Sequence, residues 1–163
     1  MEKVIYSEAS EMKDLATKIK ERYFLYVGHV DLDTIHFTFK NAETIPKSAK
    51  IAELSSIKSA WVRQILAMLH DNRLYCISSW EEMWNDLEPE QKEWLIFDLM
   101  YSVHPSCDSR LRKPDVSEHG IICEFLGPYW RRGETPLPSL LGSIDPLPIP
   151  PPPMDGDDGA TVE

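Results

Sequence analysis

The chain has 163 residues, with 17 Lys and Arg against 27 Asp and Glu, which gives a formal net charge of -10. This length is typical of one domain, and 42% hydrophobic residues are enough to build a core. A negative surface repels phosphate backbones, which excludes non-specific nucleic-acid binding. No apolar run reaches the roughly 18 residues of a transmembrane helix. We therefore expect neither a nucleic-acid nor a membrane partner.

The first half of the chain predicts two amphipathic helices and a few short strands. Apolar residues recur at helical spacing from Met12 to Tyr23, with Ser7 or Ser10 as the capping residue. Strands are expected where runs are apolar or alternate between apolar and polar, over residues 24–27, 35–40 and 74–77. A second amphipathic helix between the last two strands has an apolar face made of Ile57, Trp61, Ile65, Leu66 and Leu69.

The second half of the chain predicts helices. A short helical segment follows Ser79, which we expect to cap it, and a long helix covers residues 89–103. The long helix is apolar nearly all round, with Asp98 and Ser102 as interruptions, so we expect it to be buried on most sides. A last helix is expected over residues 115–126. Together the elements predict an α+β fold, with a small mixed sheet of about three strands packed on helices.

The acidic charge is concentrated at the C-terminal end. Residues 134–163 hold six acidic residues, no Lys or Arg and eight of the 13 prolines. Subtracting this -6 from -10 leaves -4 for residues 1–133. A proline-rich acidic segment buries too little apolar surface to offset its ordering entropy. We therefore expect a globular domain over residues 1–133 and a disordered tail over residues 134–163, which solubilises the chain or docks on a partner, and whose deletion leaves the thermal midpoint nearly unchanged.

One stretch of the chain carries a family resemblance. It reads Trp84-x-x-Leu87-x-Pro89-Glu90-Gln91-x-Glu93-x-Leu95-Ile96, and Pro114-Asp115-Val116-x-Glu118 and Gly127-Pro128-Tyr129-Trp130 follow it. It resembles the putative phage metallopeptidase family. Members show a tryptophan, a leucine–threonine–glutamate–glutamate–glutamine–arginine helix start, then His-Glu-Leu-x-His, His-Asp-Val-Glu-Glu-Phe and Gly-x-Trp. The resemblance spans most of residues 8–133 and implies a minimal zincin-like domain.

The sequence departs from that family at the positions that hold a metal. In a His-Glu-x-x-His helix, histidines four residues apart bind one zinc, and the glutamate activates a water. The resemblance aligns the histidines with Phe97 and Tyr101, the glutamate with Asp98 and a third ligand with Pro114. Phe and Pro offer no lone pair to a metal, and Tyr is an uncommon zinc ligand. We therefore expect no catalytic residue at these positions, and we expect Phe97 and Tyr101 to pack as an aromatic pair.

Asp98 itself has two interpretations. A carboxylate in so apolar a helix is either a remnant general base with a raised pKa or the partner of a basic side chain. We favour the second interpretation, with Arg110 or Arg112 as examples of the partner.

A second metal site is conceivable outside that motif. His104-x2-Cys107 and His119-x3-Cys123 approach zinc-finger spacing and supply two nitrogen and two sulfur ligands. All four side chains must converge on one point, however, and a cysteine on an amphipathic helix is commonly a small buried hydrophobe. We expect no cofactor, and zinc on His104, Cys107, His119 and Cys123 is the alternative.

These observations predict a phage or prophage protein that has a metallopeptidase-like fold, no longer hydrolyses peptide bonds and binds a protein partner. One alternative is a metal-dependent hydrolase with displaced ligands such as His104, Cys107, His119 or Asp115. Another is an acidic nucleic-acid mimic that inhibits a host DNA-binding protein, although residues 1–133 carry only -4. Three cysteines without framework spacing, and an N-terminus without a signal-peptide pattern, predict a cytoplasmic protein, in the host cytoplasm if phage-encoded.

Overall fold

A four-stranded mixed sheet forms the base of the fold. The computed structural model describes residues 3–106, 108–113, 119–127, 130–132, 136–142 and 146–147. The strands lie in the order β1-β2-β4-β3, with β2 parallel to β4 and each outer strand antiparallel to its neighbour. This confirms the α+β class, although the sheet has four strands and not about three. The strands are β1 (Ile5–Glu8), β2 (Ile35–Asn41), β3 (Ala52–Ser56) and β4 (Tyr75–Trp80).

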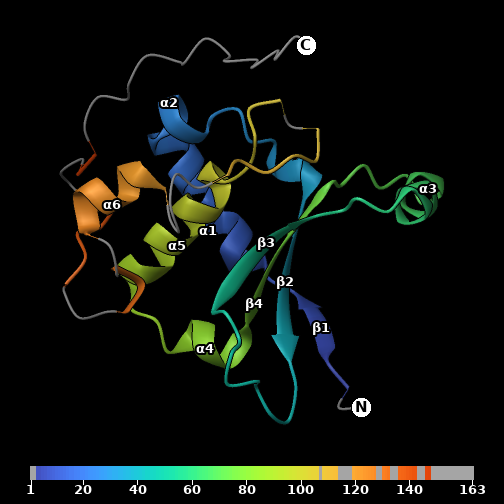
Figure 1. The fold of residues 1–163 in the computed structure, drawn as a ribbon, viewed down its shortest axis with the longest axis horizontal. Helices are drawn as coiled ribbons and strands as arrows, with labels where there is room; N and C mark the ends of the chain where they lie inside the picture. Colours follow the sequence, from blue (N-terminus) through green and yellow to red (C-terminus); the bar gives the residue numbers. More distant parts are fainter. Residues whose placement is uncertain are drawn as a thin grey trace, which may run out of the picture.

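Most helices are grouped beside the sheet, as Figure 1 shows, whereas α3 lies by itself at the far end of β3 and β4. The core lies where α1 and α5 meet each other and the buried side chains of β2. Two short 3₁₀ segments, Leu32–Thr34 and Trp130–Arg132, complete the described elements. The helices are α1 (Ser10–Arg22), α2 (Phe24–Val27), α3 (Ala60–Met68), α4 (Glu81–Asn85), α5 (Pro89–Tyr101) and α6 (Gly120–Leu126).

Helix α5 is the central element, and its start follows directly from the sequence. Pro89 occupies the first turn, where a missing N–H costs nothing. The Glu88 side chain accepts a bond from the backbone of the first turn, and the Glu88 N–H donates to Gln91 Oε1 at 3.0 Å, which forms a capping box. Residues 93–100 are all buried, which confirms the expectation of a helix surrounded on most sides.

Three local predictions in the first half are wrong or incomplete. Residues 24–27, expected as a strand, form α2, because a short apolar run fits either kind of element and here it continues the turn after α1. Strands β1 and β3 were not predicted. Strand β1 is only four residues long and fully exposed, and β3 contains no β-branched or aromatic residue, so both elements depend on pairing with neighbouring strands.

The expected serine caps are also wrong. Helix α1 begins after Ala9, which makes no side-chain capping bond, and Ser10 is already helical. Ser79 Oγ donates to the Ile51 carbonyl at 2.6 Å, so this hydroxyl ties β4 to the start of β3 and leaves α4 uncapped. The last helix is described from Gly120 onward, and the expected start at Asp115 lies outside the described residues.

The segment of residues 136–142 packs on α5, which contradicts the expected disorder for this part of the tail. Leu140 is fully buried, and the buried Glu93 carboxylate accepts bonds from the Leu140 N–H at 2.6 Å and the Leu141 N–H at 3.2 Å. Trp94 Nε1 donates to the Pro138 carbonyl at 2.8 Å. Leu140 and Leu147 of the expected tail are part of the core cluster, so we now expect deletion of residues 134–163 to lower the thermal midpoint. The end of the expected tail, residues 148–163, lies outside the described residues.

Candidate functional site

The face of α5 where the resemblance expects two metal-binding histidines is part of an aromatic core. The Phe97 side chain is fully buried, and its ring stacks on Tyr101 with centroids 6.1 Å apart and an interplanar angle of 15°. The rings of Tyr23, Tyr26 and Trp94 meet Phe97 edge-on at 5.8, 6.0 and 5.9 Å. The structure therefore confirms the aromatic pair, and no space is left beside Phe97 for a metal with bound water.

Asp98 lies on a different side of α5 and is 2% exposed. Its Oδ2 atom forms an ion pair with the Arg131 guanidinium, which is supplied by the short 3₁₀ segment. A cationic partner was expected, but its identity differs. Arg110 pairs with Asp108, and the Arg112 guanidinium lies 4.0 Å from the centroid of the Tyr101 ring.

The C-terminal end of α5 brings a buried histidine to the helix. Ser102 Oγ lies 2.7 Å from Nε2 of His119, which is 4% exposed and packs edge-on against Tyr101. Ser102 Oγ also donates to the Asp98 carbonyl at 2.9 Å. Because a hydroxyl has one proton, His119 Nε2 then donates to Ser102 Oγ. This is the reverse of the proton transfer that activates a serine nucleophile.

Sequence reasoning placed Asp98 and His119 in separate hypotheses and treated Ser102 as an interruption. In the structure Ser102 links the His119 ring to the backbone carbonyl of Asp98, whereas the Asp98 carboxylate pairs with Arg131. A usable signal was present, because Ser102 follows Asp98 by four residues and therefore shares its helix face. The position of His119 could not be derived in this way, since it depends on how the chain returns to α5.

The alternative zinc site has no support among the described residues. His104 Nδ1 accepts from the Ser106 backbone N–H at 3.2 Å in an exposed loop, whereas Cys123 lies on α6, four residues after His119. Cys107, Pro114 and Asp115 lie outside the described residues. Within the described part of the chain, no three His, Cys, Asp or Glu side chains are grouped to hold a metal.

The donor set of α5 does not fit the metal that a metallopeptidase uses. The helix contains neither His nor Cys, so shifting the alignment by a residue does not recover a His-Glu-x-x-His site. Its buried carboxylates are both engaged, Asp98 with Arg131 and Glu93 with the backbone of residues 140–141. No step of metal-assisted hydrolysis can be assigned to these residues.

A cavity of about 230 Å³ lies between α5 and the start of β3. Its polar side chains are one amide and two cations, from Gln91, Lys50 and Arg131, which oppose the binding of a metal ion. The indole Nε1 of Trp130 is buried nearby without a hydrogen-bond partner among the described residues. The apolar lining of the cavity comes from Ala49, Ile51, Ala52, Leu87, Leu95, Trp130 and Leu137.

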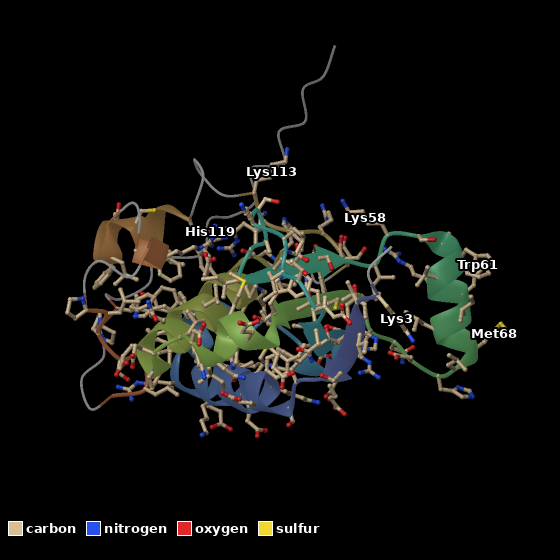
Figure 2. All side chains as sticks on the ribbon, turned by 90° about the horizontal axis from the view of Figure 1, so that it is seen from below. Lys3, Lys58, Trp61, Met68, Lys113 and His119 are labelled. Atoms are coloured by element: carbon tan, nitrogen blue, oxygen red, sulfur yellow. The ribbon has the colours of Figure 1, made fainter. Side chains whose placement is uncertain are left out.

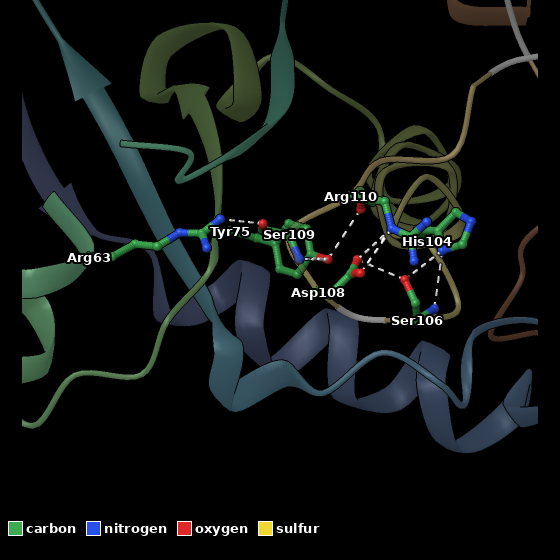
Figure 3. A network of polar contacts seen from close by, with 7 residues as sticks. All are labelled: Arg63, Tyr75, His104, Ser106, Asp108, Ser109 and Arg110. Atoms are coloured by element: carbon green, nitrogen blue, oxygen red, sulfur yellow. Dashed lines mark hydrogen bonds and ion pairs between the residues drawn. The ribbon is translucent and has the colours of Figure 1, made fainter. Parts of the chain in front are cut away.

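A second polar network fixes the loop that follows α5 (Figure 3). Tyr75 Oη accepts from the Ser109 N–H at 2.9 Å and donates to the Arg110 carbonyl at 3.2 Å. The Arg110 guanidinium and the Ser106 hydroxyl hold the pKa of Asp108 well below its usual range. Ser109 Oγ also accepts a bond from the Arg63 guanidinium of α3, so this loop is the point where α3 is attached to the body.

One of three comparisons with known proteins finds a match. The family model for the putative phage metallopeptidase matches residues 4–142, from the start of β1 to the end of the segment that packs on α5. The match thus passes the expected domain boundary and includes residues 136–142. No curated protein and no solved structure matches the chain. Since the family model covers well over half of the sequence, this chain belongs to the putative phage metallopeptidase family.

Proposed function

We propose that this chain binds another protein and does not hydrolyse peptide bonds. The observation that carries the proposal is the fully buried Phe97, stacked on Tyr101 at the two positions where the resemblance expects metal-binding histidines. A metallopeptidase needs an open coordination position for water or substrate. Phe97 offers neither a ligand nor access, and the partly buried Tyr101 is stacked on it with the Arg112 guanidinium over its ring.

The polar groups nearby support the same proposal. Asp98 is the candidate remnant of a general base, but its carboxylate is buried and paired with the Arg131 guanidinium. A base must reach the proton that it abstracts and must be free to accept it. His119 donates to Ser102 in the arrangement described above, which leaves this pair without the polarity of a nucleophile and its base.

We infer the binding role because a scaffold that no longer hydrolyses peptide bonds still has a folded surface that a partner can contact. The chain keeps a packed core and an exposed apolar helix, α3, and family membership points to a phage-encoded protein. In this proposal the protein acts in the host cytoplasm on a protein partner.

A hydrolysis assay tests the loss of activity. Purified full-length protein is incubated with casein and with a mixed peptide library, with added Zn²⁺ and with 1,10-phenanthroline. The variants His119→Ala and Asp98→Asn are compared with Leu25→Ala, which truncates a side chain that is 79% exposed. We expect no chelator-sensitive hydrolysis in any sample. Hydrolysis that the chelator and His119→Ala abolish, but Leu25→Ala preserves, would show a surviving metalloenzyme.

A further inference from the structure

Helix α3 and its connections, residues 57–73, form an arm that stands away from the rest of the protein. Figures 1 and 2 both show α3 separated from the other helices, and in Figure 2 Trp61 and Met68 lie on its outer side. No residue of α3 is buried, although seven of its nine residues are hydrophobic. A helix this apolar is normally covered by another element.

The orientation of α3 is inverted with respect to an ordinary surface helix. Its apolar side chains face solvent, with Trp61 70% exposed and Met68 81% exposed, and Leu69 directly after it is 70% exposed. Its basic side chain, Arg63, donates from Nε to the Ile57 carbonyl within the arm at 2.7 Å. The Arg63 guanidinium also bonds Ser109 Oγ on the loop that follows α5 (Figure 3). These contacts hold the helix in place before any partner binds.

The exposed side chains follow the spacing of a helix that docks in a groove. Trp61 and Met68 occupy positions i and i+7, with the half-buried Ile65 at i+4 between them, and the exposed Val62 and Leu69 extend the same side. We propose that α3 docks in an apolar groove with an acidic rim on a partner protein. The inference rests on the proposed binding role and names the surface that carries it.

Charge favours the acidic rim. Residues 57–73 contain Lys58, Arg63 and Arg73 against Asp71, which is three positive charges and one negative, or +2, in a chain of -10. The arm therefore has the opposite sign to the chain as a whole, so an acidic partner is attracted to the arm and repelled by the rest.

Two other occupants fit less well. Two copies of a nine-residue helix touch along a line and bury far less than the roughly 800 Å² per partner of a standard interface, and both arms are positive. Anionic lipid is recognised by clusters of about four to eight basic side chains, whereas the arm has three, of which Arg63 is turned to the body. A concave protein groove covers both flanks of the helix at once.

Calmodulin is a suitable defined probe, because Ca²⁺ opens its Met-rich apolar groove and removal of Ca²⁺ closes it. The probe is titrated into the full-length protein and followed by calorimetry. We expect Ca²⁺-dependent binding that the double change Trp61→Ala, Met68→Ala weakens by about tenfold or more. The matched control is Phe24→Ala, Leu25→Ala, which truncates side chains 63% and 79% exposed on α2 and leaves the affinity unchanged.

Charge is tested separately. Lys58→Glu is expected to weaken the complex and to flatten its salt dependence, whereas Lys18→Glu on the exposed side of α1 leaves both as they are. Absence of Ca²⁺-dependent binding, or equal binding by the Trp61, Met68 double variant, would overturn the docking proposal.

Two further measurements identify the competing occupants. Light scattering that shows a dimer lost in the Trp61, Met68 double variant would assign α3 to a second copy. Sedimentation with phosphatidylcholine–phosphatidylserine vesicles would assign it to lipid. Chelator-sensitive hydrolysis in the earlier assay would contradict the proposed function without changing any of these readouts, so the two proposals fail separately.

Discussion

Asp98 and Phe97 are adjacent residues of α5, but their side chains lie in different surroundings. Phe97 is enclosed by aromatic rings, whereas Asp98 is a buried carboxylate beside a guanidinium. The stacking of Phe97 on Tyr101 could be predicted, because it depends on helical spacing alone. The pairing of Asp98 with Arg131 could not, because the two residues lie 33 positions apart and meet only through the tertiary fold.

The ion pair predicts the effect of removing Arg131. Arg131→Met leaves the Asp98 carboxylate buried without this partner, and we expect a loss of about 1–3 kcal/mol in the free energy of unfolding. Urea denaturation followed by circular dichroism measures it. Arg110→Met is the control, because its pair with Asp108 has side chains 63% and 49% exposed and is screened by water, so its loss should matter less. Equal losses in the free energy of unfolding would mean that burial does not strengthen the ion pair of Asp98 with Arg131.

His29 provides a prediction on acid sensitivity. Burial lowers the pKa of His29 from its ordinary value of 6.5, although its Nε2 atom bonds the Val103 carbonyl at 3.0 Å. The unfolded chain therefore binds more protons than the folded protein as the pH falls through and below that value, so stability decreases with falling pH. His29→Gln keeps an N–H donor and removes this titration.

We therefore expect the free energy of unfolding of His29→Gln to fall less between about pH 7.5 and 5.5 than that of the wild type. His36, whose pKa is also lowered, mainly by burial, remains in both proteins and supplies a common background. Urea denaturation across this range checks the difference. Parallel curves would show that His29 does not contribute to the acid sensitivity.

At the scale of elements, α5 is held by segments from both ends of the chain. Tyr23 at the end of α1 donates its hydroxyl to the Leu140 carbonyl at 2.7 Å, and Glu93 binds the backbone of the same segment. The proline-rich, acidic composition of residues 134–163 predicts disorder for residues 136–142 as well. One leucine and the carboxylate of Glu93 outweigh that tendency, which a compositional argument cannot detect.

The described part of the expected tail can be tested through Leu140. This side chain is fully buried, so Leu140→Ala should leave a cavity and cost about 2–5 kcal/mol. Leu25→Ala, at a site 79% exposed, should change the free energy of unfolding by less than about 0.5 kcal/mol. The comparison uses urea denaturation of full-length chains. If the Leu140 variant is as stable as the Leu25 variant, the prediction of a disordered tail stands.

Across the whole molecule, the sequence predicted the fold class, the long buried helix and the family, whereas pairing partners came from the structure. A strongly periodic segment such as α1, or one that is apolar nearly all round such as α5, can be predicted from the sequence alone. Strands β1 and β3 cannot, because β1 is a four-residue exposed edge strand and β3 has little strand propensity, so both depend on pairing within the sheet. The candidate site follows the same rule. The contact of Phe97 with Tyr101 is predictable because both lie on one helix, whereas His119 and Arg131 come from later segments and their contacts are not.

A separate question is whether any helix crosses a membrane. No helix in the described part of the chain combines the length and the apolar character that crossing a bilayer requires. The exposed apolar surface of α3 is what the proposed docking on a protein groove would cover, and the charge of the arm supports that proposal.

The central claim is that the core of α5 has replaced a metal site, and zinc content tests it most directly. Protein produced in zinc-supplemented medium is dialysed against metal-free buffer, and zinc per chain is measured by mass spectrometry. The account predicts far less than one zinc per chain. About one zinc per chain, retained through dialysis and lost in His119→Ala or in Cys107→Ser, would contradict it.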